Sequence, residues 1–133
     1  MSDLTLNIPN VVDEVSQAFE RYEKGLLDSD VEVLDDTFWN SPQTIRYARD
    51  RQGYGFDEIH AHRLARPAGI MVKDVRRRLV ITTFGQDLAT VNMEYTNKGT
   101  ERIGRQSQTW VRMQDAGWKV VSAHVSFLED PAA

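Results

Sequence analysis

The first part of the chain carries apolar residues at helical spacing. Between Pro9 and Leu27 they recur every three or four positions, with charged residues between them, and they are Val12, Val15, Phe19, Tyr22 and Leu26. This spacing predicts an amphipathic helix whose apolar stripe packs against another element. Proline suits the first turn of a helix, and the DSD sequence at 28–30 is typical of a helix end followed by the cap of a short second helix through Leu34.

Alternating apolar and polar positions dominate the rest of the chain. A strand is expected around Ile45, and the DRQGYG sequence that follows supplies turn residues. A third helix is expected from Phe56 to about Arg66, because Pro67 cannot continue it. Four long segments rich in Val, Ile, Thr, Trp and Phe predict strands, at 72–84, 87–97, 102–113 and 117–128. Helices followed by a meander of strands indicate an α+β domain whose sheet bends around its helices.

Composition limits the class of protein. A chain of 133 residues fits one domain with one hydrophobic core. The absence of cysteine excludes disulfides, thiolate metal sites and a cysteine nucleophile, and it favours a reducing, cytoplasmic location. No apolar run approaches the roughly 20 residues that span a bilayer, and the N-terminal MSDLTLN lacks the pattern of a signal peptide. We therefore expect no membrane partner.

Charge argues against nucleic acid as a partner. The formal net charge of −4 repels phosphate backbones. The basic run at 76–78 lies in a predicted strand, where alternation splits its arginines between two faces without interleaved aromatic residues. We expect these arginines at a solvated edge or in pairs between subunits.

Two polar residues in apolar surroundings are the first candidates for chemistry. Tyr22 shares the helical stripe, so its hydroxyl is either a core phenol bonded to a carbonyl or a proton donor in a pocket. Arg46 lies between Ile45 and Tyr47, which point to the opposite face of the strand. Alternation does not decide which face meets the helices. An inward Arg46 predicts a carboxylate clamp, because a buried guanidinium without an anion is costly.

Arg63 and Trp39 are further candidates for substrate binding. Arg63 follows Phe56 and Ile59 on one helical face, so it either extends its head group to solvent or joins Arg46 as a second cation. Trp39 precedes an Asn-Ser-Pro turn and forms either a pocket wall or part of the core.

The three histidines do not predict a metal site. His60 and His62 are two residues apart on a helix, whereas a helical zinc pair needs a spacing of four. His124 alternates with Ser122 and Ser126 on the polar face of the last strand, where a dimer contact is favoured over catalysis. We expect neither a metal nor another cofactor.

The C-terminal third carries a recognisable pattern. GRQSQTWVRMQDAGWKVVSAHVS resembles the closing hairpin of SnoaL-like proteins in the nuclear transport factor 2 superfamily, and the element order matches over residues 1–133. The combination of FWNSPQTIRYA, YGFDEIHAHRLARP and GRQSQTW resembles the AtzH-like family more narrowly. This resemblance implies a single cone-shaped domain, in which a strongly curved antiparallel sheet wraps a long N-terminal helix and two shorter ones.

The resemblance also implies an activity. AtzH-like proteins are found beside amidases of cyanuric acid and oxalurate catabolism, and the implied reaction converts 1,3-dicarboxyurea to allophanate and carbon dioxide. The implied catalytic roles fall on Tyr22 and Arg46, without metal or cofactor. The substrate is then a small anionic carboxylated urea, and a homodimer is implied. Sequence leaves open amide hydrolysis or carbamate decarboxylation, and it also leaves open a non-catalytic accessory or small-anion-binding subunit of a neighbouring amidase.

Overall fold

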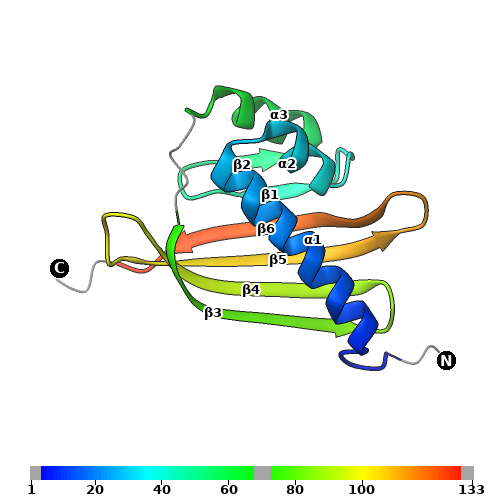
Figure 1. Cartoon of the computed structure of the whole chain (residues 1–133). Coiled ribbons are helices and arrows are strands. Elements are labelled where there is room, and N and C mark those ends of the chain that lie inside the picture. Colours follow the sequence, from blue (N-terminus) through cyan, green and yellow to red (C-terminus); the bar gives the residue numbers. More distant parts are fainter. Residues whose placement is uncertain (1–3, 68–72, 130–133) are drawn as a thin grey trace.

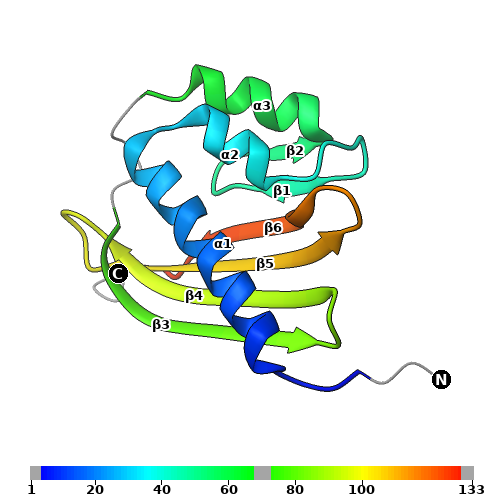
Figure 2. The same ribbon diagram turned by 45° about the vertical axis from the view of Figure 1, so that its right-hand side comes forward.

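The computed structural model describes residues 4–67 and 73–129, which form three helices and one six-stranded sheet (Figure 1). The long helix α1 crosses the concave face of the sheet, and the two shorter helices lie with β1 and β2 at one end (Figures 1 and 2). The elements are α1 (Pro9–Asp28), α2 (Val31–Thr37), β1 (Ile45–Tyr47), β2 (Gln52–Tyr54), α3 (Phe56–Ala65), β3 (Lys73–Phe84), β4 (Leu88–Asn97), β5 (Ile103–Met113) and β6 (Gly117–Phe127). The predicted α+β cone is confirmed.

The helices follow from local sequence signals. Helix α1 begins with Pro9 and ends where Ser29 adopts a left-handed conformation, from which its N–H donates to the carbonyl of Leu26 at 3.2 Å. The side chain of Asp30 caps α2 by accepting from the N–H of Val33 at 3.2 Å. This second helix runs to Thr37, three residues beyond the predicted end. None of the described helices is long and apolar enough to cross a membrane.

The strand order is β2-β1-β6-β5-β4-β3. Strands β3 to β6 form an antiparallel meander, whereas β1 pairs in parallel with β6. Register shifts interrupt β3 twice and the β5–β6 pairing once, and such bulges bend and twist a strand. The resulting curvature is visible in Figure 2. The four long strands match their predictions within about one residue at each end, although residue 72 lies outside the described residues.

The prediction of a turn over DRQGYG was partly wrong, because Gln52–Tyr54 forms strand β2 and pairs antiparallel with β1. Gly53 lies opposite Arg46, and a Cβ at this glycine would lie 2.8 Å from the side chain of Ile59 on α3. The glycine that suggests a turn therefore allows α3 to pack closely over a strand.

A core of aliphatic and aromatic side chains fills the space between α1 and the sheet. Its fully buried members include Val15, Phe19, Leu34, Phe38, Ile59, Val91, Trp110 and Val120. Toward the end of the sheet near β1 the interior becomes polar, with buried Arg46, Arg63 and Gln106. The interior side chains thus change from apolar to polar and charged. A functional site can lie at this end, because buried charges need partners or ligands.

We expect Gly104→Ala to destabilise the fold. The rings of Tyr95 and Phe127 meet edge to face over this glycine with centroids 6.0 Å apart, and a Cβ there would lie 2.7 Å from the Tyr95 ring. Such overpacking typically costs about 1–3 kcal/mol of unfolding free energy. Chemical denaturation measures it, with Arg105→Ala on the adjacent exposed position as the control. Equal stability of the two variants would contradict the prediction.

Candidate functional site

A cavity of about 560 Å³ opens at the end of the sheet near β1, between α3 and the end of β6. Its charged lining residues are Arg46, Arg49, Asp50, Arg51, Arg63 and Arg66. The lining thus contains five arginines and one aspartate, although the whole chain has a net charge of −4. This concentration of positive charge in a concave site attracts small anions.

Arg46 points into the cone. In the parallel pairing with β6 it lies opposite the buried Ala123, whereas its neighbours Ile45 and Tyr47 lie opposite Ser122 and His124. Only 8% of Arg46 is exposed, against 39% of Tyr47. No carboxylate within the described ranges lies within 4.0 Å of its guanidinium. A buried, permanently charged group without an anion is a candidate ligand-binding group.

Arg63 is held in place by a carboxylate on a neighbouring helix. Its side chain is 1% exposed, and its Nη1 donates to Asp35 Oδ1 at 3.0 Å. The guanidinium carbon lies 4.2 Å from the centroid of the Phe38 ring. Burial lowers the pKa of Arg63, against the opposing effects of Tyr22 and Asp35. Its Nη2 is buried without a hydrogen-bond partner, and the residue is part of the cavity lining.

Tyr22 is buried on α1 beside these two arginines. Its ring packs against Phe38 with centroids 5.9 Å apart. Burial raises the pKa of the Tyr22 hydroxyl, while the charges of Arg46 and Arg63 oppose that rise. The phenol therefore keeps its proton at neutral pH. Tyr22 is not itself among the residues that line the cavity.

Sequence reasoning missed part of the cationic lining. Arg66 lies three residues after Arg63, and burial together with the charge of Arg46 lowers its pKa. Arg49 and Arg51 lie in the connection between β1, which carries Arg46, and β2. The closely spaced arginines of RYARDR and the three-residue interval from Arg63 to Arg66 were the available signals.

Trp39 lies apart from this cluster. Its backbone N–H donates to the carbonyl of Val120 at 2.9 Å, which ties the segment after α2 to β6. The side chain is partly buried and does not belong to the cavity lining. The structure thus brings together three of the four predicted site residues, and the wall role of Trp39 stays a prediction.

The histidines occupy three different environments. His60 Nδ1 contacts Asp35 Oδ2 at 2.5 Å, on the side of this carboxylate that Arg63 leaves free. His62 lines the cavity, and His124 lies on the outer face with its ring 5.5 Å from that of Tyr47. The described residues contain no group of three or more His, Cys, Asp or Glu side chains arranged to hold a metal ion.

Comparison with known families decides the relationship. The AtzH-like family model matches residues 4–131, nearly the whole chain. This chain belongs to the AtzH-like family. The matched residues include the inward arginine, the buried tyrosine and the lining of the cationic cavity. Comparison with curated proteins gave no match.

Solved structures support the same relationship. A protein of unknown function from Pectobacterium atrosepticum is 46% identical, with 93% of this chain and 95% of that chain covered and a TM-score of 0.89. A cystatin-like fold protein from Burkholderia xenovorans is 40% identical, with 96% and 99% covered and a TM-score of 0.90. An NTF2-like protein of unknown function from Pseudomonas putida is 20% identical, with 92% and 89% covered and a TM-score of 0.75. The last likeness shows the shared fold alone.

Proposed function

We propose that this AtzH-like protein is a decarboxylating amidohydrolase that acts on a small N-carboxylated urea and converts 1,3-dicarboxyurea to allophanate and carbon dioxide. The observation that carries the proposal is the inward Arg46, buried and without a carboxylate partner among the described residues, in a cavity lined by four further arginines. A permanent buried charge of this kind is stabilised when an anion binds beside it.

Arg46 and Arg63 account for binding. A planar guanidinium offers paired donors that match a carboxylate, and the unpartnered Nη2 of Arg63 offers another donor. Asp35 holds Arg63 in one orientation, so little side-chain freedom is lost when a ligand binds. One carboxylate held at this end directs the other end of the substrate toward Tyr22, which converts binding energy into orientation.

Tyr22 accounts for the chemical step. In the proposed reaction its hydroxyl donates a proton to the nitrogen that carries the departing carboxyl group. The carbon–nitrogen bond then breaks, its electron pair stays on nitrogen, and carbon dioxide leaves. The nearby arginines stabilise the phenolate that forms. The substrate dianion and one proton thus become the allophanate monoanion and carbon dioxide.

The direct test is the decay of 1,3-dicarboxyurea with and without the purified protein. We expect the protein to accelerate loss of the substrate and to yield allophanate and carbon dioxide in equal amounts. Time-resolved product analysis, corrected for spontaneous decay, measures both quantities. Tight binding without accelerated decay would instead identify a passive anion-binding protein. Acceleration only in the presence of a neighbouring amidase would identify an accessory subunit.

A further inference from the structure

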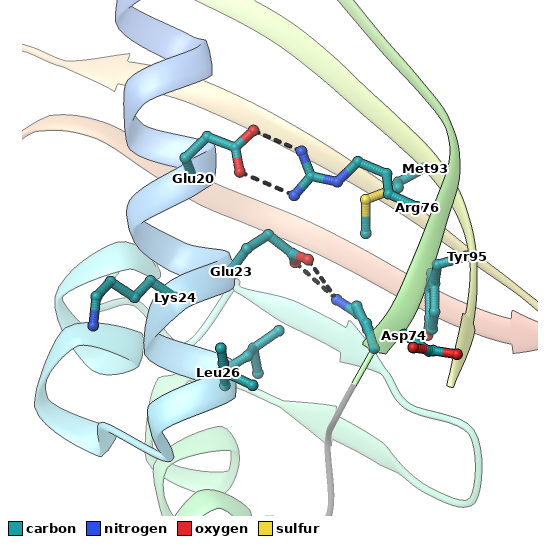
Figure 3. Close-up of a pocket in the computed structure, with 10 residues that line it drawn as sticks. Glu20, Glu23, Lys24, Leu26, Asp74, Arg76, Met93 and Tyr95 are labelled. Atoms are coloured by element: carbon teal, nitrogen blue, oxygen red, sulfur yellow. Dashed lines mark hydrogen bonds and ion pairs between the residues drawn. The ribbon is translucent and has the colours of Figure 1, made fainter. Parts of the chain in front are cut away.

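A second cavity, of about 290 Å³, lies between α1 and the strands β3 and β4 (Figure 3). Two cations from β3 line it, and both are paired with carboxylates of α1. Lys73 Nζ lies 2.8 Å from Glu23 Oε2, and Arg76 Nη1 lies 2.7 Å from Glu20 Oε2. Carboxylates of the protein itself therefore balance these two cations, and no ligand is needed for that purpose.

The arginine-lined cavity differs in this respect. Arg46 is buried and Arg66 is half-buried, yet neither side chain has a hydrogen bond or an ion pair with any other described residue. Every other lysine or arginine that is buried or half-buried within residues 4–67 and 73–129 donates to a carboxylate or to a backbone carbonyl. The fold thus supplies a partner for each of these interior cations except two, as expected for groups whose partner is a ligand.

Arg46 and Arg66 line the same cavity from different elements. Arg46 lies on β1, whereas Arg66 directly follows α3. The charge of Arg46 lowers the pKa of Arg66, and the charge of Arg66 acts in turn to lower the pKa of Tyr22. Two like charges in the same half-enclosed site repel each other in the free protein, and an anion bound to both relieves that repulsion.

The sequence fixes the backbone from which the Arg66 side chain extends. Its N–H donates to the carbonyl of Arg63 at 3.3 Å, and its φ of −78° and ψ of 130° are extended values. Pro67 follows, and proline favours this extended conformation in the residue before it. Arg66 therefore starts from a defined backbone position, which reduces the entropy lost when its side chain binds a ligand.

We propose that Arg66 is a further substrate-binding residue, which together with Arg46 binds the carboxylate that the reaction retains. This inference rests on the proposed function. A carboxylate accepts several hydrogen bonds, so two guanidinium groups can donate to the same one. Arg63 differs from this pair because Asp35 already accepts from one of its nitrogens.

The chemistry of the proposed reaction decides which carboxylate the pair binds. The departing carboxyl group loses its negative charge as carbon dioxide forms, so guanidinium groups beside it would stabilise the substrate more than the transition state. The retained carboxylate keeps its charge throughout. Contacts with it stabilise the substrate and the transition state equally, and the loss of such a contact raises KM without lowering kcat.

The kinetic test uses Arg66→Gln. With 1,3-dicarboxyurea we expect KM to rise about 10-fold, the lower end for the loss of a hydrogen bond to a charged group, while kcat stays within about threefold. Steady-state kinetics measures both constants. Arg77→Gln makes the same change at an exposed position outside both cavities, and this control should keep both constants. An unchanged KM in Arg66→Gln, or a loss confined to kcat, would overturn the inference.

Direct binding shows which carboxylate Arg66 contacts, and it does not depend on turnover. Glutarate carries two carboxylates, separated by as many chain atoms as those of 1,3-dicarboxyurea, whereas butyrate carries one. Titration followed by NMR, which measures weak binding, should show about 10-fold weaker binding of both ligands to Arg66→Gln, because each places one carboxylate between Arg46 and Arg66. Weaker binding of glutarate alone would assign Arg66 to the other carboxylate and reject the shared contact. Unchanged binding of both ligands would exclude any contact.

Thermal unfolding separates ligand binding from helix capping. A cation at the end of a helix stabilises it through the helix dipole, so a capping role predicts that ligand-free Arg66→Gln unfolds at a lower temperature. We expect the same or a higher temperature, because the substitution removes a charge that repels Arg46. A lower unfolding temperature together with weaker binding would count against a direct contact with the ligand.

Failure of this inference is distinguishable from failure of the proposed function. If the unmodified protein binds glutarate through Arg66 but does not accelerate the decay of 1,3-dicarboxyurea, the proposed function fails and the binding role of Arg66 stands. If the unmodified protein accelerates the decay and Arg66→Gln has the same KM, only the role of Arg66 fails.

Discussion

Arg46→Met is expected to lower kcat/KM for 1,3-dicarboxyurea by about 30- to 5000-fold, which corresponds to about 2–5 kcal/mol for the loss of one partner of a buried charge pair. The change should raise KM and also lower kcat, because the same contact binds the substrate and orients it toward Tyr22. Steady-state kinetics measures both effects.

The stability of the same variant separates ligand binding from a structural role. Arg46 is buried near Arg63 and Arg66, and no described carboxylate pairs with it. Removing a cation from such surroundings relieves repulsion and desolvation, so thermal unfolding of ligand-free Arg46→Met should occur at the same or a higher temperature. Arg105→Met, on the exposed part of β5, is the control and should keep full activity. Loss of both activity and stability in Arg46→Met would contradict the binding role.

Tyr22→Phe is expected to reduce kcat by about 10²–10⁴-fold, the usual contribution of a positioned acid. The phenylalanine ring keeps the packing against Phe38, so substrate affinity should change little. Because burial raises the pKa of Tyr22, the phenol of the unmodified protein should keep its proton at least up to its ordinary pKa of about 10. The Tyr22-dependent part of the rate should therefore fall only under more alkaline conditions.

Kinetics and direct binding together test this assignment. Isothermal titration with a stable dicarboxylate should give similar Kd values for Tyr22→Phe and the unmodified protein. Leu64→Ala, an exposed change on α3, is a suitable control for general effects of mutation. A Tyr22→Phe protein with the turnover of the unmodified protein would exclude proton donation by this hydroxyl.

Periodicity predicted most of the fold and part of the site. Local spacing and helix-end residues located α1, α2 and α3, since these signals lie within the segments themselves. The inner face of β6 was less predictable. Strict alternation from the buried Ala123 would put Val121 in the core, but the register shift between the pairs of Thr109 and Trp110 leaves Val121 half-buried and places Val120 there instead. A bulge depends on the partner strand and is not encoded by alternation in one segment.

The direction of Arg46 shows the same limit. The sequence of a three-residue strand does not show which of its faces points toward the core. The orientation of β1 comes from the parallel pairing of Arg46 with Ala123 on β6. The contact between Asp35 and Arg63 likewise joins residues 28 positions apart on two helices. These tertiary contacts leave no periodic signal, which is why sequence alone identified the candidate side chains but left their orientation open.

The arginine lining of the cavity also affects the release of the product. Coulomb attraction scales with the charge of the ligand. The proposed reaction converts a dianion into a monoanion and uncharged carbon dioxide. It therefore roughly halves the electrostatic attraction between the arginines of the cavity and the remaining product, allophanate. The chemical step would thereby weaken retention of its own product. Fresh substrate, with twice the charge, would displace allophanate without any movement of the protein.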